Sequence, residues 1–82
     1  MQETNHHWVQ AAPFRALVLW LVELTGLPWA VLAEQAEVPP AVVHRLLHGR
    51  GGRRPARIPR DCAVRLLALD GHALTHLARQ RR

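Results

Sequence analysis

The stretch that decides the fold is LAEQAEVPPAVVHRLLHG, which runs from Leu32 to Gly49. Apolar residues recur at helical spacing before and after the prolines Pro39 and Pro40. Proline is tolerated in the first turn of a helix, and a glycine beyond the last apolar residue is typical of a helix end. The stretch therefore predicts two short helices joined by a tight turn.

Further helices are predicted on both sides of this stretch, and no segment has the alternation typical of a strand. Gly26 suits a left-handed end for the first helix, with Leu27 as the apolar residue beyond it. The predicted helices span 13–25, 28–36, 39 or 40 to 49, 59–69 and, as a short fifth helix, 72–79. The expected fold class is all-α, a compact bundle of four to five short helices that contains a helix-turn-helix.

The apolar spacing also predicts the core. The first helix has one apolar stripe, at Phe14, Leu17, Leu21 and Leu24, but Val18 and Val22 are apolar and lie off that stripe. A helix that is apolar on most sides is either central in its domain or in contact with a second chain. Val18 and Val22 are therefore candidates for a homodimer or partner face. The later helices are expected to bury Leu32, Ala33, Val43, Leu46, Leu47, Cys62, Ala63, Leu66 and Leu67.

Length and composition predict one small domain. We expect a flexible N-terminal arm at residues 1–10, the helical domain at 11–78 and a basic C-terminal tail at 79–82. A single cysteine, Cys62, excludes an internal disulfide framework. The longest apolar run, Ala16 to Val22, is far shorter than the ~20 residues that span a bilayer. We therefore expect no membrane partner and a cytoplasmic location.

The charge is both high and clustered. The chain has eleven arginines, no lysine and six acidic residues, which gives a formal net charge of +5. No acidic residue occurs between Val38 and Arg60, although six arginines do. Codon bias toward arginine explains the missing lysine but not this clustering. A basic cluster favours polyanionic partners.

The chain resembles the lambda-repressor-like helix-turn-helix family over roughly Leu17 to Leu69, and within it the small actinobacterial and phage regulators. The residues that carry the resemblance are Leu32-Ala33 with Ala36 and Val38, then Leu46-Leu47-His48-Gly49-Arg50, then Ile58-Pro59-Arg60-Asp61-Cys62-Ala63. The resemblance implies a sequence-preferring DNA-binding protein that acts as a transcriptional regulator, with the helix after Pro39 in the major groove. It also implies that the partners are double-stranded DNA and either a second copy of the chain or another protein. It implies no cofactor.

Two positions depart from the family's pattern. Glu37 stands where the turn usually has glycine, and a non-glycine residue in a left-handed turn costs roughly 1 kcal/mol. Pro39 replaces the usual serine or threonine cap, a loss of about 1 kcal/mol. The family reads bases from the first turn of this helix, which here is apolar and suits only contact with a thymine methyl.

The expected DNA contacts follow from these positions. Polar base reading is left to His44, Arg45 and His48, and Arg45 lies on the helix face opposite Leu47. With the apolar first turn, the predicted base-reading residues are Pro40, Ala41, His44, Arg45 and His48. The predicted phosphate-binding residues are Arg50, Arg53, Arg54, Arg57 and Arg60, which follow in and beyond a loop broken by glycine and proline.

Other functions are less well supported by the sequence. A protein-interaction module on the same fold is the main alternative, docking a regulator, sigma factor or toxin through the apolar start of the helix after Pro39. His44 with His48, and His72 with His76, have the i, i+4 spacing of zinc ligands, but no third ligand has a fitting spacing, so no metal is expected. The carboxylates are scattered and no phosphate-binding glycine loop occurs, so neither an enzyme nor a small-molecule substrate is expected.

Overall fold

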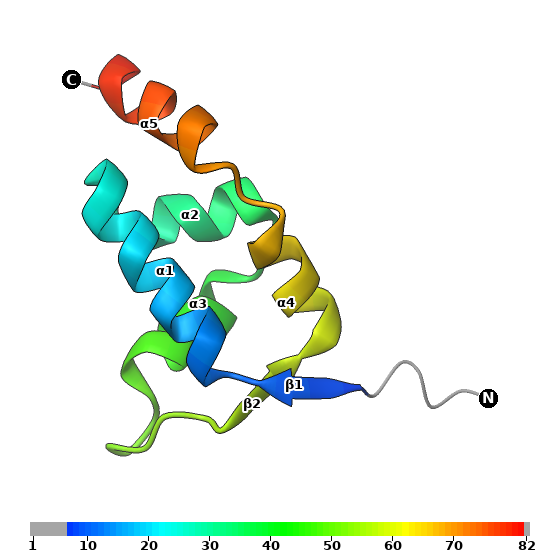
Figure 1. Ribbon diagram of the computed structural model, residues 1–82. Coiled ribbons are helices and arrows are strands. Elements are labelled where there is room, and N and C mark those ends of the chain that lie inside the picture. Colours follow the sequence, from blue (N-terminus) through cyan, green and yellow to red (C-terminus); the bar gives the residue numbers. More distant parts are fainter. Residues whose placement is uncertain (1–6, 82) are drawn as a thin grey trace.

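Five helices and one two-stranded sheet make up the fold in the computed structural model, which describes residues 7–81 (Figure 1). The prediction of a mostly helical chain is confirmed. In chain order the elements are β1 (Trp8–Gln10), α1 (Ala12–Thr25), α2 (Trp29–Ala36), α3 (Pro40–His48), β2 (Arg57–Pro59), α4 (Arg60–Leu67) and α5 (Gly71–Gln80).

The expectation of a purely helical fold is wrong, because β1 and β2 pair as an antiparallel sheet. Val9 lies opposite Ile58 in this pairing. The backbone N–H of Ala11 donates to the Ala56 carbonyl at 2.9 Å, and the backbone N–H of Arg60 donates to the His7 carbonyl at 3.0 Å. These two bonds extend the pairing at both ends. Strands of three residues are too short to show alternation, so the apolar pattern could not predict them. Of the predicted N-terminal arm, the last three residues form β1, and residues 1–6 lie outside the described part.

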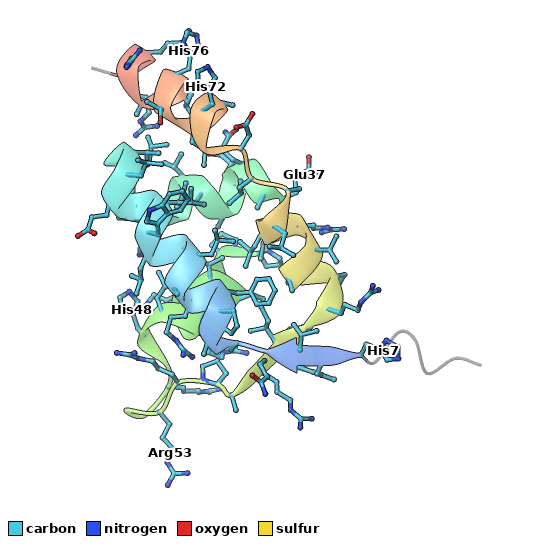
Figure 2. The ribbon with its side chains drawn as sticks, viewed as in Figure 1. His7, Glu37, His48, Arg53, His72 and His76 are labelled. Carbon is cyan, nitrogen blue, oxygen red and sulfur yellow. The ribbon has the colours of Figure 1, made fainter. Side chains whose placement is uncertain are left out.

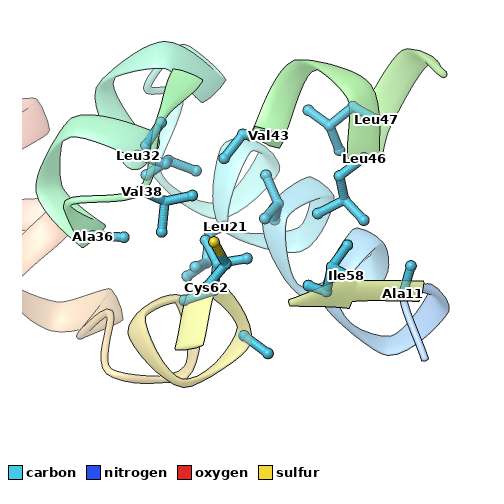
Figure 3. Close-up of a cluster of buried hydrophobic side chains, with 14 of the residues drawn as sticks. Ala11, Leu21, Leu32, Ala36, Val38, Val43, Leu46, Leu47, Ile58 and Cys62 are labelled. Atoms are coloured by element: carbon cyan, nitrogen blue, oxygen red, sulfur yellow. The ribbon is translucent and has the colours of Figure 1, made fainter. Parts of the chain in front are cut away.

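The core lies between the helices α1 to α4 and the inner face of the sheet, and Leu74 of α5 adds to it (Figure 3). Its largest fully buried side chains are Leu21, Leu32, Leu46, Leu66, Val18 and Val43. The predicted burial of Ala33, Leu47, Cys62 and Ala63 is confirmed as well. Leu67 was expected inside but is 64% exposed, because the buried face of α4 is formed by Cys62, Ala63 and Leu66, and Leu67 points away from it.

The orientation of α1 differs from the prediction. Val18 is 0% exposed, so the proposal that it belongs to a partner face is wrong. The inward face of α1 is Val18, Leu21 and Thr25, and Leu24, expected inside, is half exposed. The reason is that α1 is covered by helices on more than one side, including α5, and a single apolar stripe does not fix which side is central. Val22 is half-buried and packs against the core.

The ends of α1 and α2 are closed by left-handed residues. Gly26 has φ 75°, as predicted for the end of α1, and its N–H donates to the Val22 carbonyl. At the end of α2, Glu37 has φ 59° and is the only non-glycine residue with positive φ in the described part of the chain. Its N–H donates to the Glu34 carbonyl at 3.1 Å, and the N–H of Val38 donates to the Ala33 carbonyl at 3.0 Å. These two bonds form a Schellman motif, which normally takes glycine where this chain has Glu37.

Replacing Glu37 with glycine is expected to stabilise the protein by about 0.5–1 kcal/mol, because it removes left-handed strain from a residue with a β-carbon. Glu34→Gly is the matched control. It removes the same charge from the same exposed helix but lies at a right-handed interior position, where glycine costs about 1 kcal/mol. Urea unfolding of both variants measures the difference. A Glu37→Gly variant less stable than the wild type would show that the left-handed conformation of Glu37 is not strained.

The last two helices complete the domain. Asp70 caps α5 by accepting from the backbone N–H of His72 at 2.9 Å, and α5 continues to Gln80, so the predicted tail is partly helical. On α4, burial raises the pKa of the Cys62 thiol, and the Asp61 carboxylate adds to this effect while Arg65 opposes it. The thiol therefore stays protonated at neutral pH. No single helix within residues 7–81 is long and apolar enough to cross a membrane, and α1 with α2, bent by 113°, passes that test only as a pair.

Candidate nucleic-acid interface

The outer face of α3 presents the side chains that the sequence predicted for base reading. Val43, Leu46 and Leu47 are buried against the core. The 3.6-residue period then turns the remaining positions outward, and Pro40, Ala41, His44, Arg45 and His48 are all exposed. Helix α3 thus has an apolar inner face and a mixed apolar and basic outer face.

A shallow groove of about 380 Å³, open to solvent, lies over this outer face. Trp29, the first residue of α2, lines this groove with His44 of α3, and His48 of α3 joins these two rings in an aromatic cluster. The centroids of the Trp29 and His44 rings are 5.5 Å apart, and those of His44 and His48 are 4.9 Å apart. Both imidazoles therefore lie next to the indole of Trp29. The full lining is Trp29, Pro40, Ala41, His44, Arg45, Gly49 and Arg50.

The histidine pairs have few potential metal ligands around them. No group of three or more His, Cys, Asp or Glu residues that fits a metal ion occurs within residues 7–81. On α5, His76 instead lies 3.3 Å from the amide nitrogen of Gln80. The arrangement of His44 and His48 is therefore best described by their contacts with Trp29.

The residues after α3 form a tight turn with an arginine on each side. Arg50 and Arg53 exchange backbone hydrogen bonds of 2.8 and 3.1 Å, and the two glycines between them both have positive φ, as in the primed turns of β-hairpins. We call Arg50-Gly51-Gly52-Arg53 the arginine turn. Figure 2 shows the Arg53 side chain directed away from the body of the protein. The first four residues of the predicted basic loop thus form a hairpin turn.

Gly49 connects α3 to the arginine turn in a conformation that only glycine adopts readily. Its φ of 77° and ψ of −167° lie in a region that disfavours side chains. A β-carbon built on Gly49 would lie 2.2 Å from the backbone oxygen of Arg53. The close approach of these two backbone segments is what brings the arginine turn back beside the end of α3.

Arg15 on α1 fixes the other side of the same loop. Its Nε donates to the Leu46 carbonyl on α3 at 2.7 Å, and its Nη2 donates to the Pro55 carbonyl at 2.9 Å. The first bond satisfies one of the last carbonyls of α3, which have no partner within the helix. Arg15 is partly buried and was not among the predicted site residues, because nothing in the sequence shows which distant carbonyls a guanidinium will reach.

The remaining predicted phosphate-binding arginines are all exposed but do not lie together. Arg54 follows the arginine turn directly, and Arg57 is the first residue of β2. Arg60 opens α4 at the other end of β2 and does not line the groove over α3. The cations nearest the outer face of α3 are therefore Arg45 and Arg50.

Comparison with known proteins finds no matching family model, no matching curated protein and no matching solved structure. A fold by itself does not define a function. The function therefore has to be argued from the residues of this surface.

Proposed function

We propose that this protein binds double-stranded DNA through a helix-turn-helix formed by α2 and α3, and that it acts as a transcriptional regulator. The observation that carries the proposal is the outer face of α3. It combines exposed His44, Arg45 and His48 with the arginine turn at the end of the same helix. A helix enters the major groove with side chains on its outer face, while flanking cations bind phosphates.

The two parts of the surface have different roles in this proposal. Arg45 lies at the middle of the exposed face of α3, where its guanidinium suits two hydrogen bonds to a guanine edge. Pro40 and Ala41 offer only apolar contact, which suits a thymine methyl. Arg50, Arg53 and Arg54 bind phosphate, which positions the protein without reading sequence.

The salt dependence of duplex binding tests the proposal. With four to six arginines at phosphates, the slope of log K against log salt is expected to be roughly −4 to −5. Replacing Arg50, Arg53 and Arg54 with alanine is expected to make the slope shallower by about 2.7, because each lost phosphate contact removes about 0.9. Fluorescence anisotropy of a labelled duplex, selected from genomic fragments, measures both.

Arg79→Ala is the matched control, because Arg79 is equally exposed but lies on α5. It is expected to leave the slope unchanged within about 0.5. No binding at low salt, or a slope near zero in the wild type, would overturn the proposal. Binding of a protein partner that is lost on changing Pro40 but not on removing charge would instead support an interaction module.

Arg45→Ala and Arg53→Ala separate base reading from phosphate binding. Loss of Arg45 is expected to cost about 1–3 kcal/mol on the preferred site and less on random DNA. Loss of Arg53 is expected to weaken binding to both duplexes equally, because a phosphate is present at every step. Equal behaviour of the two variants would remove Arg45 from the base-reading residues.

A further inference from the structure

The outer face of the two-stranded sheet carries an exposed indole beside an arginine. Residues opposite each other in an antiparallel pair share a face, and successive residues alternate between faces. Val9 and Ile58 face the core, so Trp8 and Pro59, with Gln10 and Arg57, face outward. Trp8 is 56% exposed. A large apolar ring in such a position is a feature that the fold alone does not require.

A hollow of about 180 Å³ lies next to Trp8, between the sheet and α3. Five of its lining residues are apolar, and the other two are Arg45 and Arg57. The full lining is Trp8, Val42, Arg45, Pro55, Arg57, Ile58 and Pro59. We call it the Trp8 hollow. It has apolar walls and a guanidinium from each of two elements.

The Trp8 hollow adjoins the groove over α3. Arg45 lines both, so the two concavities meet at this side chain. No acidic residue occurs in the sequence between Val38 and Arg60, which supplies α3, the arginine turn and β2. A ligand that follows the cations from α3 therefore reaches the sheet without crossing a carboxylate from this segment.

We propose that the Trp8 hollow is a second contact site for DNA, which takes the sugar and base edge of a nucleotide next to the base pairs at α3. This inference rests on the proposed function and names a part of the interface beyond α3. A nucleotide presents an apolar ring beside an anion, and the hollow presents an indole beside two guanidinium groups. Apolar and aromatic side chains contact base edges in a duplex, and arginine binds the adjoining phosphate.

The indole N–H resonances in a ¹⁵N NMR spectrum of the wild-type protein test this site. The three tryptophans are assigned by single replacement with phenylalanine. Addition of the duplex is expected to shift the Trp8 resonance, because DNA then covers the ring. The Trp20 resonance is expected to stay in place, since Trp20 is exposed on α1 and lines neither concavity. The titration itself is made on the wild-type protein, and the replacements serve only to assign the resonances.

Substitution gives a second, independent readout. Trp8→Ala is expected to lower duplex affinity about tenfold, because the apolar surface that DNA would cover is lost, and to leave the salt slope unchanged because no charge is removed. Arg57→Ala is expected to lower affinity and also make the slope shallower by about 0.9. Trp8→Phe keeps an aromatic ring and is expected to retain most of the affinity.

The outcomes distinguish this inference from the proposed function. In one outcome the duplex binds with the expected slope, but the Trp8 resonance does not move and Trp8→Ala keeps full affinity. This outcome overturns the role of the Trp8 hollow as a DNA contact and leaves α3 as the interface. A Trp20 shift as large as that of Trp8 also overturns it, because the change is then not local. Absence of any duplex binding at low salt overturns the proposed function and the hollow together.

Discussion

Replacing Gly49 with alanine is expected to destabilise the protein by about 3 kcal/mol and to displace the arginine turn. The added β-carbon would lie 2.2 Å from the backbone oxygen of Arg53, and 2.9 Å from the Arg54 nitrogen. Backbone atoms cannot rotate away as a side chain does, so the turn itself has to move. The conformation of Gly49 adds strain of about 1–3 kcal/mol for any residue with a side chain.

Gly51→Ala is the matched control for this experiment. Gly51 also has positive φ, at 61°, but a β-carbon there meets nothing within 4 Å. It is expected to cost only about 1 kcal/mol, the strain of the left-handed conformation alone. Urea unfolding gives the two stabilities, and anisotropy shows whether Gly49→Ala also flattens the salt slope. Equal costs for the two alanines would show that the approach of Gly49 to Arg53 is not what holds the turn.

The second large effect is expected for Val18→Glu, which should strongly destabilise the protein. Val18 is 0% exposed, so the change removes a buried apolar side chain and places a carboxylate among Leu21, Leu32 and their neighbours. The expected cost is about 4 kcal/mol or more. Stabilities of small domains are about 5–15 kcal/mol, so this is a large fraction of the total. Circular dichroism and urea unfolding measure the loss.

Leu19→Glu provides the comparison on the same helix. Leu19 is the next residue but is 52% exposed, so its replacement is expected to cost less than about 1 kcal/mol. Sedimentation of both variants measures their oligomeric state. A Val18→Glu variant that stays folded and loses only self-association would restore the partner face that the buried position of Val18 excludes.

The sequence was most informative where the signals are local. The boundaries of α2 and α3 match the prediction within a residue, because prolines, a glycine and apolar spacing all act within the segment itself. The left-handed conformation expected for Glu37 is likewise present. The exposure of His44, Arg45 and His48 follows directly from the buried face of α3. Most of the candidate site was therefore predictable.

The contacts between distant segments were not predictable from these patterns. Val9 lies opposite Ile58 in the sheet, and neither three-residue strand has a sequence pattern that indicates which segment it pairs with. In the sequence, Arg15 is a charged residue in an apolar helix. In the structure it donates to the carbonyls of Leu46 and Pro55. The side of α1 that faces inward depends on where α5 packs, which local spacing does not determine.

The pairing of β1 with β2 also sets an order for folding. The partners Val9 and Ile58 are separated by the whole of α1, α2 and α3. Contacts between neighbouring helices close short loops and form early, whereas a long loop costs more entropy to close. During synthesis β1 emerges first but has no partner until β2 has been made. We therefore expect the strand that carries Trp8 to dock after α1, α2 and α3 have packed together, because its partner Ile58 follows all three helices in the chain.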